Sequence, residues 1–427
     1  MDLELRLLLT GNELMSGVTV DSNSALIARK LEPLSLQVCA KHTIGDDRDL
    51  LCAELERLAS ASDVLIVNGG LGPTRDDLTA EALAAVCGVP LEESAVALAH
   101  LEAWSAQRGY AMNAANRKQA MLPAGAAVIP NAVGSAVGFR VRYRDCEILC
   151  TPGVPGELRV MLDREIVPWL GAQFPAADRV VITRLQFFGI GESGLQQLLS
   201  EQCPDWPPHI ELGFRAGAPT LELKISSFRA ADERDRLACE QRVRELFGDY
   251  IIGTGDTSLA RCVVELLGRA GQRVATAESC TGGLIAAMLT EVPGASAVYE
   301  AGVVSYSNRI KQQLLGVEAH TLAEHGAVSE QVVREMARGA LALSGAEHVV
   351  SVSGVAGPDG GSADKPVGTV WICWGGQGRL RARQLYFPVA RKLFQTMVAA
   401  TALDLLRREI LGIEEEPRYF RERVLRR

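Results

Sequence analysis

The chain repeats one pattern: a short apolar run of strand length ends in a glycine-rich polar loop, and a helical segment follows. In the first 170 residues, the strand-like runs 4–9, 63–67 and 147–150 alternate with helix-like segments at 21–31 and 80–86. Strands that alternate with helices form parallel sheets covered by helices, and ligands bind at the carboxyl ends of such strands. The pattern therefore predicts an α/β fold whose sites lie in the glycine-rich loops.

Changes in this pattern divide the chain into domains. A single hydrophobic core rarely grows beyond about 250 residues, and this chain has 427. We expect a parallel-sheet domain over 1–172, a small α+β connecting domain over 173–254, an α/β domain over 255–413 and a charged tail over 414–427. The first boundary is expected near 171–178. The tail and the charged run from Asp232 to Arg236 predict solvated surfaces.

Composition excludes several classes of partner. The net charge of -8 disfavours attraction to nucleic acid and to anionic membranes, and 5% aromatic residues provide few stacking platforms. Apolar runs are about 4 to 8 residues long, against roughly 18 for a membrane span. Acidic residues in the first six positions do not fit a signal peptide, so a cytoplasmic protein is expected. The ten cysteines, with no Cys-x-x-Cys pair, read as buried apolar side chains, Cys280 included.

The most informative motif is Ala277-Glu278-Ser279-Cys280-Thr281-Gly282-Gly283, which follows an apolar run and opens a helix-like segment at 281–290. Ser279 is a candidate nucleophile, because the unpaired N–H groups at a helix start attract incoming negative charge. Thr281, Gly282 and Gly283 allow a ligand to approach the backbone closely. The motif therefore indicates covalent catalysis on a carbonyl substrate such as an amide.

A serine nucleophile needs a base, and no histidine pattern provides one. Lys311 can act as the base if burial lowers its pKa enough to leave the amine neutral. Tyr306 can bridge protons or orient that base, and Asn308 can hold the substrate. Taken singly, each residue has a more ordinary role: Ser279 as a helix cap, Lys311 as a surface charge and Tyr306 as a packing residue.

A second glycine-rich loop, from Ser353 to Gly361, follows the strand-like run 349–352. Two such loops at adjacent strand ends enclose one pocket, and the second offers backbone groups at Gly354, Ala356 and Gly357. Asp359 suits a ribose hydroxyl, and Lys365 suits a phosphate.

Four motifs then stand in order: Ala-Glu-Ser-Cys-Thr-Gly-Gly, Tyr-Ser-Asn-x-x-Lys, His-Gly-Ala-Val-Ser at 325–329 and Ser-Gly-x-Ala-Gly-Pro-Asp-Gly-Gly. Over 257–411 the chain resembles the C-terminal domain of the CinA family (competence/damage-inducible protein A) and the related nicotinamide-nucleotide amidases. The resemblance implies deamidation of nicotinamide mononucleotide without a cofactor, with Ser279 as nucleophile, Lys311 as base and Tyr306 as assisting hydroxyl. Many relatives carry a Gly-Asp-Arg run where this chain has 388–395, and Arg391 aligns with the arginine that grips the phosphate.

The N-terminal domain carries its own loop, Asn68 to Thr79, after the strand-like run 64–67. Glycines in this loop permit a tight turn against phosphate, and the Asp76-Asp77 pair could bind a divalent cation. Caps and turns are the ordinary roles of such residues. The candidate site residues of this domain are Glu13, Asp21, Asn23, Gly69, Gly70, Gly72, Thr74, Asp76, Asp77, Lys118 and Glu157.

Residues 3–170 resemble the molybdopterin-binding-like domain that begins CinA proteins. The resemblance implies an ADP-ribose pyrophosphatase that uses Mg, Mn or Co, acting within a homodimer on pyridine nucleotides and ADP-ribose. Asn12 stands where relatives commonly have Asp, which removes one carboxylate. The alternative is a non-catalytic pterin- or nucleotide-binding protein, or a competence-associated one.

Overall fold

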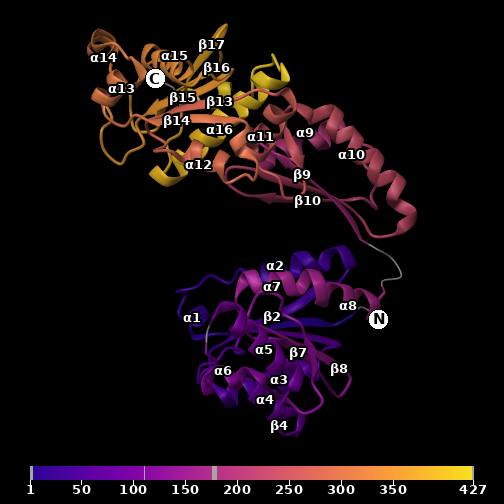
Figure 1. The fold of residues 1–427 in the computed structure, drawn as a ribbon. Helices are drawn as coiled ribbons and strands as arrows, with labels where there is room; N and C mark the ends of the chain where they lie inside the picture. Colours follow the sequence, from indigo (N-terminus) through magenta and orange to yellow (C-terminus); the bar gives the residue numbers. More distant parts are fainter. Residues whose placement is uncertain (1–2, 110, 176–179, 426–427) are drawn as a thin grey trace. The chain divides into compact units, whose positions relative to one another are not determined.

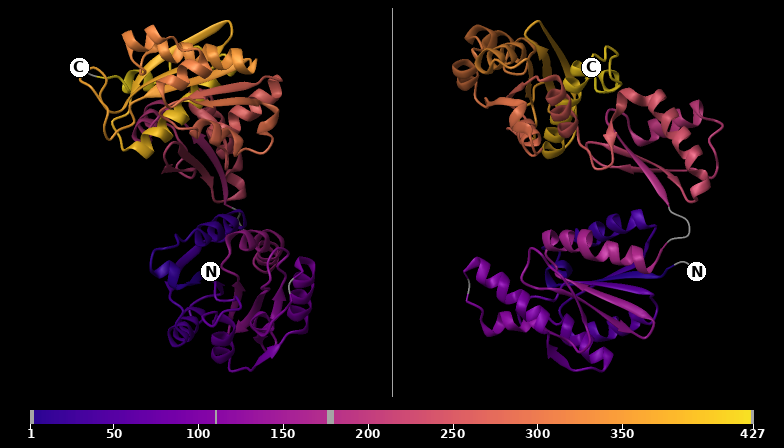
Figure 2. Two further views of the ribbon diagram at one scale, coloured as in Figure 1. Left: turned by 60° about the vertical axis from the view of Figure 1, so that its left-hand side comes forward. Right: turned by 45° about the vertical axis from the view of Figure 1, so that its right-hand side comes forward.

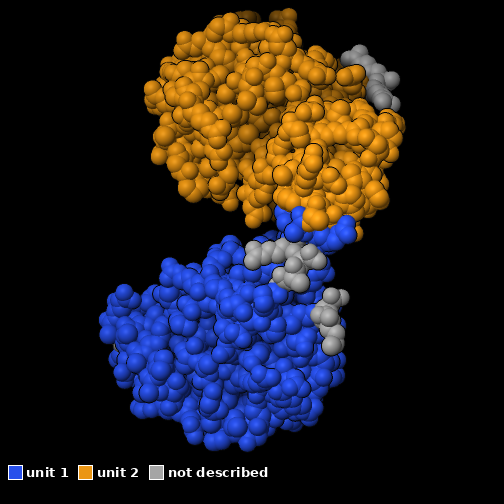
Figure 3. Space-filling view, turned by 90° about the vertical axis from the view of Figure 1, so that its right-hand side faces the viewer, with its two compact units in different colours: residues 1–181, 228–230 blue, residues 182–227, 231–427 orange. Residues whose placement is uncertain are grey.

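A computed structural model describes residues 3–109, 111–175 and 180–425. The chain forms two compact units, shown in Figures 1 and 3. The first comprises Met1–Val181 and Phe228–Ala230, and the second comprises Ile182–Ser227 and Ala231–Arg427. The connecting and C-terminal domains expected from the sequence therefore belong to one unit. Of the expected first boundary, positions 176–179 lie outside the described residues.

The first unit is built on a six-stranded sheet with the strand order β2-β1-β3-β8-β7-β6. The first four strands are parallel, and β7 and β6 are antiparallel to their neighbours. Because successive side chains of a strand point to opposite faces, Leu7 packs into one helical layer and Leu8 into the other. The strands are β1 (Leu5–Thr10), β2 (Val38–Ile44), β3 (Val64–Asn68), β6 (Ala127–Ile129), β7 (Gly138–Tyr143) and β8 (Cys146–Thr151), with a separate pair β4 (Leu91–Glu93) and β5 (Met121–Pro123).

Helices cover both faces of this sheet, as a parallel sheet requires (Figures 1 and 2). One face carries α2 (Asn23–Leu31), α7 (Pro155–Met161), a π-helical turn (Leu162–Ile166) and α8 (Val167–Gln173). The other carries α3 (Arg48–Ala59), α4 (Thr79–Cys87) and α5 (Ala95–Arg108). The short helices α1 (Asn12–Met15) and α6 (Ala114–Arg117) lie in connecting segments.

The second unit begins with a four-stranded sheet of order β10-β11-β9-β12. Its apolar side chains pack against α9 and α10 in a core of their own. The elements are β9 (Val181–Phe187), α9 (Glu192–Gln202), β10 (Glu211–Ala216), β11 (Leu221–Ser227), α10 (Glu233–Phe247) and β12 (Ile251–Thr254).

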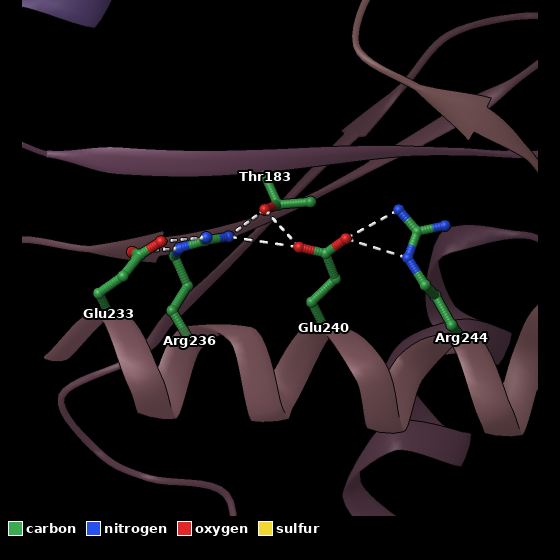
Figure 4. Close-up of polar contacts among 5 residues, drawn as sticks. All are labelled: Thr183, Glu233, Arg236, Glu240 and Arg244. Carbon is green, nitrogen blue, oxygen red and sulfur yellow. Dashed lines mark hydrogen bonds and ion pairs between the residues drawn. The ribbon is translucent and has the colours of Figure 1, made fainter.

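The charged start of α10 is a solvated face only in part: Arg234 and Asp235 are exposed, as the sequence indicates, but Arg236 is not. Arg236 is only 4% exposed and pairs with Glu233 at 2.7 Å and with Glu240 at 3.4 Å. Glu240 also accepts hydrogen bonds from Thr183 of β9 and from Arg244, as Figure 4 shows. Arg236 and Glu240 thus link one side of α10 to Thr183 of the sheet.

The C-terminal part of this unit is a five-stranded sheet of order β14-β13-β15-β16-β17. The strands β14, β13 and β15 are parallel, and β16 and β17 are antiparallel. One face packs against α11, α12 and α16, and the other against α13, α14 and α15. The strands are β13 (Val274–Glu278), β14 (Tyr299–Val304), β15 (His348–Gly354), β16 (Thr369–Gly376) and β17 (Arg379–Tyr386); the helices are α11 (Leu259–Ala270), α12 (Leu284–Thr290), α13 (Asn308–Leu315), α14 (Ala319–His325), α15 (Glu330–Ser344), α16 (Arg391–Leu411) and α17 (Tyr419–Glu422).

The closing stretch is a solvated tail only in part: residues 414–416 are exposed, as expected, but two aromatic residues that follow are not. Tyr419 and Phe420 of α17 are buried in the same core as α16, and the Tyr419 hydroxyl donates to Asp404 at 2.9 Å. The buried Asp404 also pairs with Arg407 and Arg408, whose guanidinium groups donate to the carbonyl of Asp249 in the connecting domain. The stretch after α16 therefore completes the core that joins the two sheets of this unit.

Cysteine burial follows the sequence expectation only in part. Six of the ten are buried, whereas Cys39 is exposed and three others are half-buried. In the part of the chain that the structure describes, no helix has the length and apolarity needed to cross a membrane.

Candidate active site

Three loops meet at the carboxyl ends of the parallel strands β14, β13 and β15. Ser279 directly follows β13, Tyr306 follows β14, and the loop with Gly357 follows β15. The chain passes from β13 to β14 on one side and later returns to β15 on the other. Such a reversal opens a crevice outside the strand ends, where ligands bind in α/β proteins.

The structure brings Ser279 and Lys311 into direct contact. The distance between Lys311 Nζ and Ser279 Oγ is 2.9 Å, and Nζ also donates to the carbonyl oxygen of Ser305 at 2.6 Å. Lys311 is 1% exposed and lies in the first turn of α13, which Ser307 caps through its side chain. The capped helix α13 thus carries the amine that contacts Ser279.

Burial favours the neutral form of this amine. Desolvation lowers the pKa of Lys311 from its ordinary value of 10.5. Its neighbour Cys280 is not a competing nucleophile, because burial raises the pKa of that thiol to about 12. Cys280 packs in the apolar core, as expected.

Glu278 is a site residue that the sequence had not singled out. Its buried carboxylate accepts hydrogen bonds from the Thr281 hydroxyl at 2.7 Å and from three backbone N–H groups, at Gly283, Ile285 and Ala286. The expectation that the N–H groups of the helix start are unpaired is therefore wrong for these three. The helix also begins at Leu284, later than expected, because Gly282 and Gly283 adopt left-handed φ angles of 65° and 97°.

Two backbone donors follow Ser279 directly in the turn. Among the described residues, the N–H groups of Cys280 and Thr281 have no hydrogen-bond acceptor on another residue. Gln395 of α16 donates its side-chain amide to the Cys280 carbonyl at 3.0 Å, which holds this turn from the other side. Glu278 and Gln395 thus hold the turn from two sides, and neither occupies the N–H groups of Cys280 and Thr281.

Among the described residues, Tyr306 makes no hydrogen bond to Ser279 or Lys311. Its hydroxyl accepts a hydrogen bond from Arg391 Nη2 at 3.0 Å, and Arg391 Nη1 donates to the Gly357 carbonyl at 2.7 Å. Its role as an assisting hydroxyl is therefore still a prediction.

The remaining expected substrate residues differ in exposure. Asn308 and Asp359 are exposed, whereas Gly354 is the last residue of β15 and Ala356 is buried in the apolar core. Lys365 donates to the His325 carbonyl at 2.6 Å, so it supports the motif at 325–329 in this structure.

The N-terminal unit has a cavity of about 510 Å³ at its own strand ends. Seven of the expected residues line it: Glu13, Gly69, Gly70, Gly72, Asp76, Asp77 and Glu157. Thr10 and Gln119 also line it, and each has a buried side-chain oxygen without a partner among the described residues. Unpaired buried oxygens are rare and mark a place for a ligand or ordered water.

The other expected residues of this unit support the framework and do not line the cavity. Asn23 is buried and donates to Asn68 at 2.8 Å and to the Gly153 carbonyl at 2.7 Å. Lys118 donates to the Asp77 carbonyl at 2.8 Å, and the Thr74 backbone N–H donates to the Asp77 carboxylate at 2.8 Å. Asp21 accepts a hydrogen bond from the backbone N–H of Ser24 at the start of α2 and pairs with Lys41 at 3.3 Å.

Asp46, which the sequence had not indicated, joins the acidic side of the cavity. Burial raises its pKa, and the negative charges of Glu13, Asp76 and Asp77 raise it further. Its carboxylate accepts from the Asn12 N–H at 2.9 Å, so it stands beside the position where a carboxylate is missing. No three His, Cys, Asp or Glu side chains of the described ranges form a complete metal centre. Because Mg²⁺ is often held by one or two carboxylates together with substrate phosphates, this donor set fits a cation that arrives with its substrate.

Comparisons with known proteins match both ends of the chain. A family model described as the CinA C-terminal domain matches residues 256–410, and one described as a probable molybdopterin binding domain matches 6–172. A CinA-like protein of Colwellia psychrerythraea is 48% identical over 424 residues, covering 99% of this chain and 98% of its own. A CinA-like protein of an Anaeromyxobacter species is 42% identical over 95% of this chain and 99% of its own.

Among solved structures, the competence/damage inducible protein CihA from Agrobacterium tumefaciens is 44% identical. It covers 34% of this chain and 90% of its own, with a TM-score of 0.34. The identity that extends over nearly the whole of both chains in the Colwellia comparison confirms the resemblance inferred from the motifs: this chain belongs to the CinA-like family, with an N-terminal molybdopterin-binding-like domain.

Proposed function

We propose that the C-terminal site hydrolyses the carboxamide of nicotinamide mononucleotide to nicotinate mononucleotide and ammonia. The observation that carries the proposal is the 2.9 Å contact between a buried lysine amine and a serine hydroxyl at a strand end. Burial that favours the neutral amine turns this contact into a nucleophile and base pair.

The reaction proceeds through an acyl-enzyme. Ser279 Oγ attacks the carboxamide carbon while its proton passes to Lys311 Nζ. The tetrahedral intermediate collapses as Lys311 returns that proton to the leaving nitrogen, and ammonia departs. Water then attacks the ester in the same way, which releases nicotinate mononucleotide and restores the Ser279 hydroxyl. The positive charge of the pyridinium ring makes the carbonyl more electrophilic.

The turn around Ser279 supplies the electrostatic part. The free N–H groups of Cys280 and Thr281 are the donors we assign to the developing oxyanion. Glu278 occupies the neighbouring N–H groups and so keeps the turn from rearranging. Arg391, which bonds to Tyr306 and Gly357, is the residue that we assign to the substrate phosphate.

The test is an assay with pure full-length protein. Nicotinamide mononucleotide should release ammonia, and a chelator should not reduce the rate. Nicotinamide and NAD serve as controls for substrate choice. If the mononucleotide yields no ammonia at millimolar concentration, the deamidation proposal is wrong.

For the N-terminal cavity we propose ADP-ribose pyrophosphatase activity. The support is a cavity of ligand size that joins glycine backbone, carboxylates and unpaired buried oxygens. A divalent cation (Mg, Mn or Co) held by Asp46, Asp76 or Asp77 would neutralise pyrophosphate charge and activate water. Gly69 and Gly70, with φ angles of 115° and 66°, form a turn in which a side chain would collide with Thr10 or Thr79, so the loop presents its backbone to the cavity.

This activity is tested by incubating ADP-ribose with and without a chelator and measuring AMP. The competing proposal is a non-catalytic pterin- or nucleotide-binding protein, or a competence-associated one. Saturable binding of ADP-ribose without AMP release would favour it for this unit, and salt-sensitive DNA binding would favour the competence role.

A further inference from the structure

Arg391 connects two loops of the candidate active site. It is the first residue of α16, and its guanidinium donates to the Tyr306 hydroxyl after β14 and to the Gly357 carbonyl after β15. Both acceptors are uncharged oxygens. One turn further along the same helix, Gln395 holds the carbonyl of Cys280, so this end of α16 reaches the nucleophile turn itself.

Tyr306 is consequently held away from the reacting pair. Its side chain is 64% exposed, and it makes no hydrogen bond to Ser279 or Lys311 in the described structure. Arg391, which we assign to the phosphate, thus holds Tyr306, which is expected to assist the chemistry.

We propose that Arg391 makes the site specific for phosphorylated ribosides because the substrate phosphate replaces Tyr306 on its guanidinium. This inference rests on the deamidation proposed above. It adds that phosphate binding releases Tyr306 toward the carboxamide, so the phosphate raises kcat as well as affinity.

The exchange follows from the strength of the two kinds of contact. A guanidinium binds a phosphate dianion through two parallel, charge-assisted hydrogen bonds, which are roughly twice as strong as neutral ones. Two N–H groups that now donate to neutral oxygens therefore gain by turning to the phosphate. Binding energy from a remote group is then used to organise the reacting centre.

Release places Tyr306 close to the base along the chain. It directly follows Ser305, whose carbonyl accepts the hydrogen bond from Lys311 Nζ at 2.6 Å. The Ser307 cap of α13 holds the backbone that follows Tyr306, so the proposed release is a movement of the Tyr306 side chain.

The activity test separates the phosphate from the reacting group. Nicotinamide riboside carries the same carboxamide without the phosphate, and phosphite dianion can fill the empty phosphate position. We expect the riboside to have a lower kcat than the mononucleotide, and phosphite to accelerate riboside turnover by roughly 10- to 100-fold, the factor for hydrogen bonds to a charged group.

Variants assign the effect to the arginine. Arg391→Ala should lose the phosphite response, while Arg309→Ala should keep it, because Arg309 is exposed on α13 and donates to Gln313 of the same helix at 2.8 Å. The proposal is overturned if phosphite leaves riboside turnover unchanged in the wild type, or if the mononucleotide and riboside differ in KM alone.

A second measurement does not depend on turnover. The protein has seven tyrosines, so labelling with 3-fluorotyrosine gives few ¹⁹F resonances, and Tyr306→Phe identifies the one of interest. Phosphite should shift this resonance in the wild type and in Arg309→Ala, but not in Arg391→Ala. An unshifted resonance rules out the exchange, even if neither substrate releases ammonia and the deamidation proposal has failed by itself.

Discussion

The two candidate sites occupy the same architectural position, the carboxyl ends of parallel strands, but the chain completes them to different degrees. In the C-terminal site Ser279 and Lys311, the proposed nucleophile and base, are already in contact and buried. In the N-terminal site the carboxylates repel one another and two buried oxygens lack partners among the described residues. Acyl transfer uses groups that the protein itself carries, whereas cleavage of a pyrophosphate needs a cation and phosphates to complete the charge balance.

The largest effect should separate the two sites completely. Ser279→Ala removes the nucleophile and should lower ammonia release by about 10³-fold or more. AMP release from ADP-ribose should not change, because the N-terminal cavity belongs to the other compact unit. Both products are measured on the same protein sample.

Ser200→Ala is the matched control, since Ser200 is exposed on α9 and its hydroxyl donates to the Gln196 carbonyl of the same helix. It should retain both activities. Full ammonia release by Ser279→Ala would remove this residue from the mechanism.

The pH dependence should also differ between the sites. The neutral form of Lys311 is the base, and burial lowers its pKa below 10.5. Ammonia release should therefore fall about tenfold per pH unit below that lowered pKa and level off above it. The plateau should begin below pH 10.5, and AMP release should show no such limb.

Stability gives an independent check on the same group. The folded-state pKa of Lys311 lies below its unfolded value, so between the two values the unfolded chain binds more protons and folding stability rises with pH. Lys311→Met should remove this rise, as measured by denaturant unfolding at several pH values. An unchanged pH slope in the variant would contradict the lowered pKa.

Sequence patterns predicted the features that are local. Strand-like runs that precede a glycine-rich polar loop form strands of the sheets, for example β3 before the loop with Gly69 and β13 before the loop with Ser279. Ser279 and Lys311 could be paired because a known motif order links them, although 32 residues separate them. The α/β fold class is confirmed by the parallel sheets.

What the sequence could not show depends on contacts between distant segments. Arg391 and Tyr306 are 85 residues apart, and Asn12 and Asp46 are 34 apart, so no local pattern reveals either pair. Charge runs were misleading for a related reason: Arg236 and Tyr419 have charged neighbours in sequence, yet each is buried and bonds to another element, Arg236 to Thr183 of β9 and Tyr419 to Asp404 of α16. Glu278 stands inside the motif, but only the fold shows that its carboxylate caps the next helix.

A smaller effect is expected from Glu278→Gln. The variant keeps the size of the side chain but replaces charge-assisted hydrogen bonds with neutral ones and turns an amide toward three N–H donors. We expect a loss of about 1.5–3 kcal/mol in the free energy of unfolding and a kcat for ammonia release that is roughly 10- to 100-fold lower. AMP release should be unaffected.

Glu291→Gln provides the control, because Glu291 is exposed at the other end of α12. Denaturant unfolding and steady-state kinetics on both variants separate stability from positioning. A Glu278→Gln protein with lower stability but wild-type kcat would show that this carboxylate is structural only.

The smallest effects should divide the N-terminal carboxylates into two groups. Asp46 lines the cavity beside other negative charges, whereas Asp21 pairs with Lys41 and bonds to Ser24 outside it. Because the affinity of a carboxylate site for a cation depends on the number of charged ligands, Asp46→Asn should raise the Mg²⁺ concentration needed for half-maximal AMP release by about tenfold. Asp21→Asn should change it by less than about twofold. The comparison is made by titrating Mg²⁺ into each variant at saturating ADP-ribose. Equal shifts for both variants would mean that the cation does not bind on the acidic side of this cavity, and the difference between the two sites would then lie in their chemistry alone.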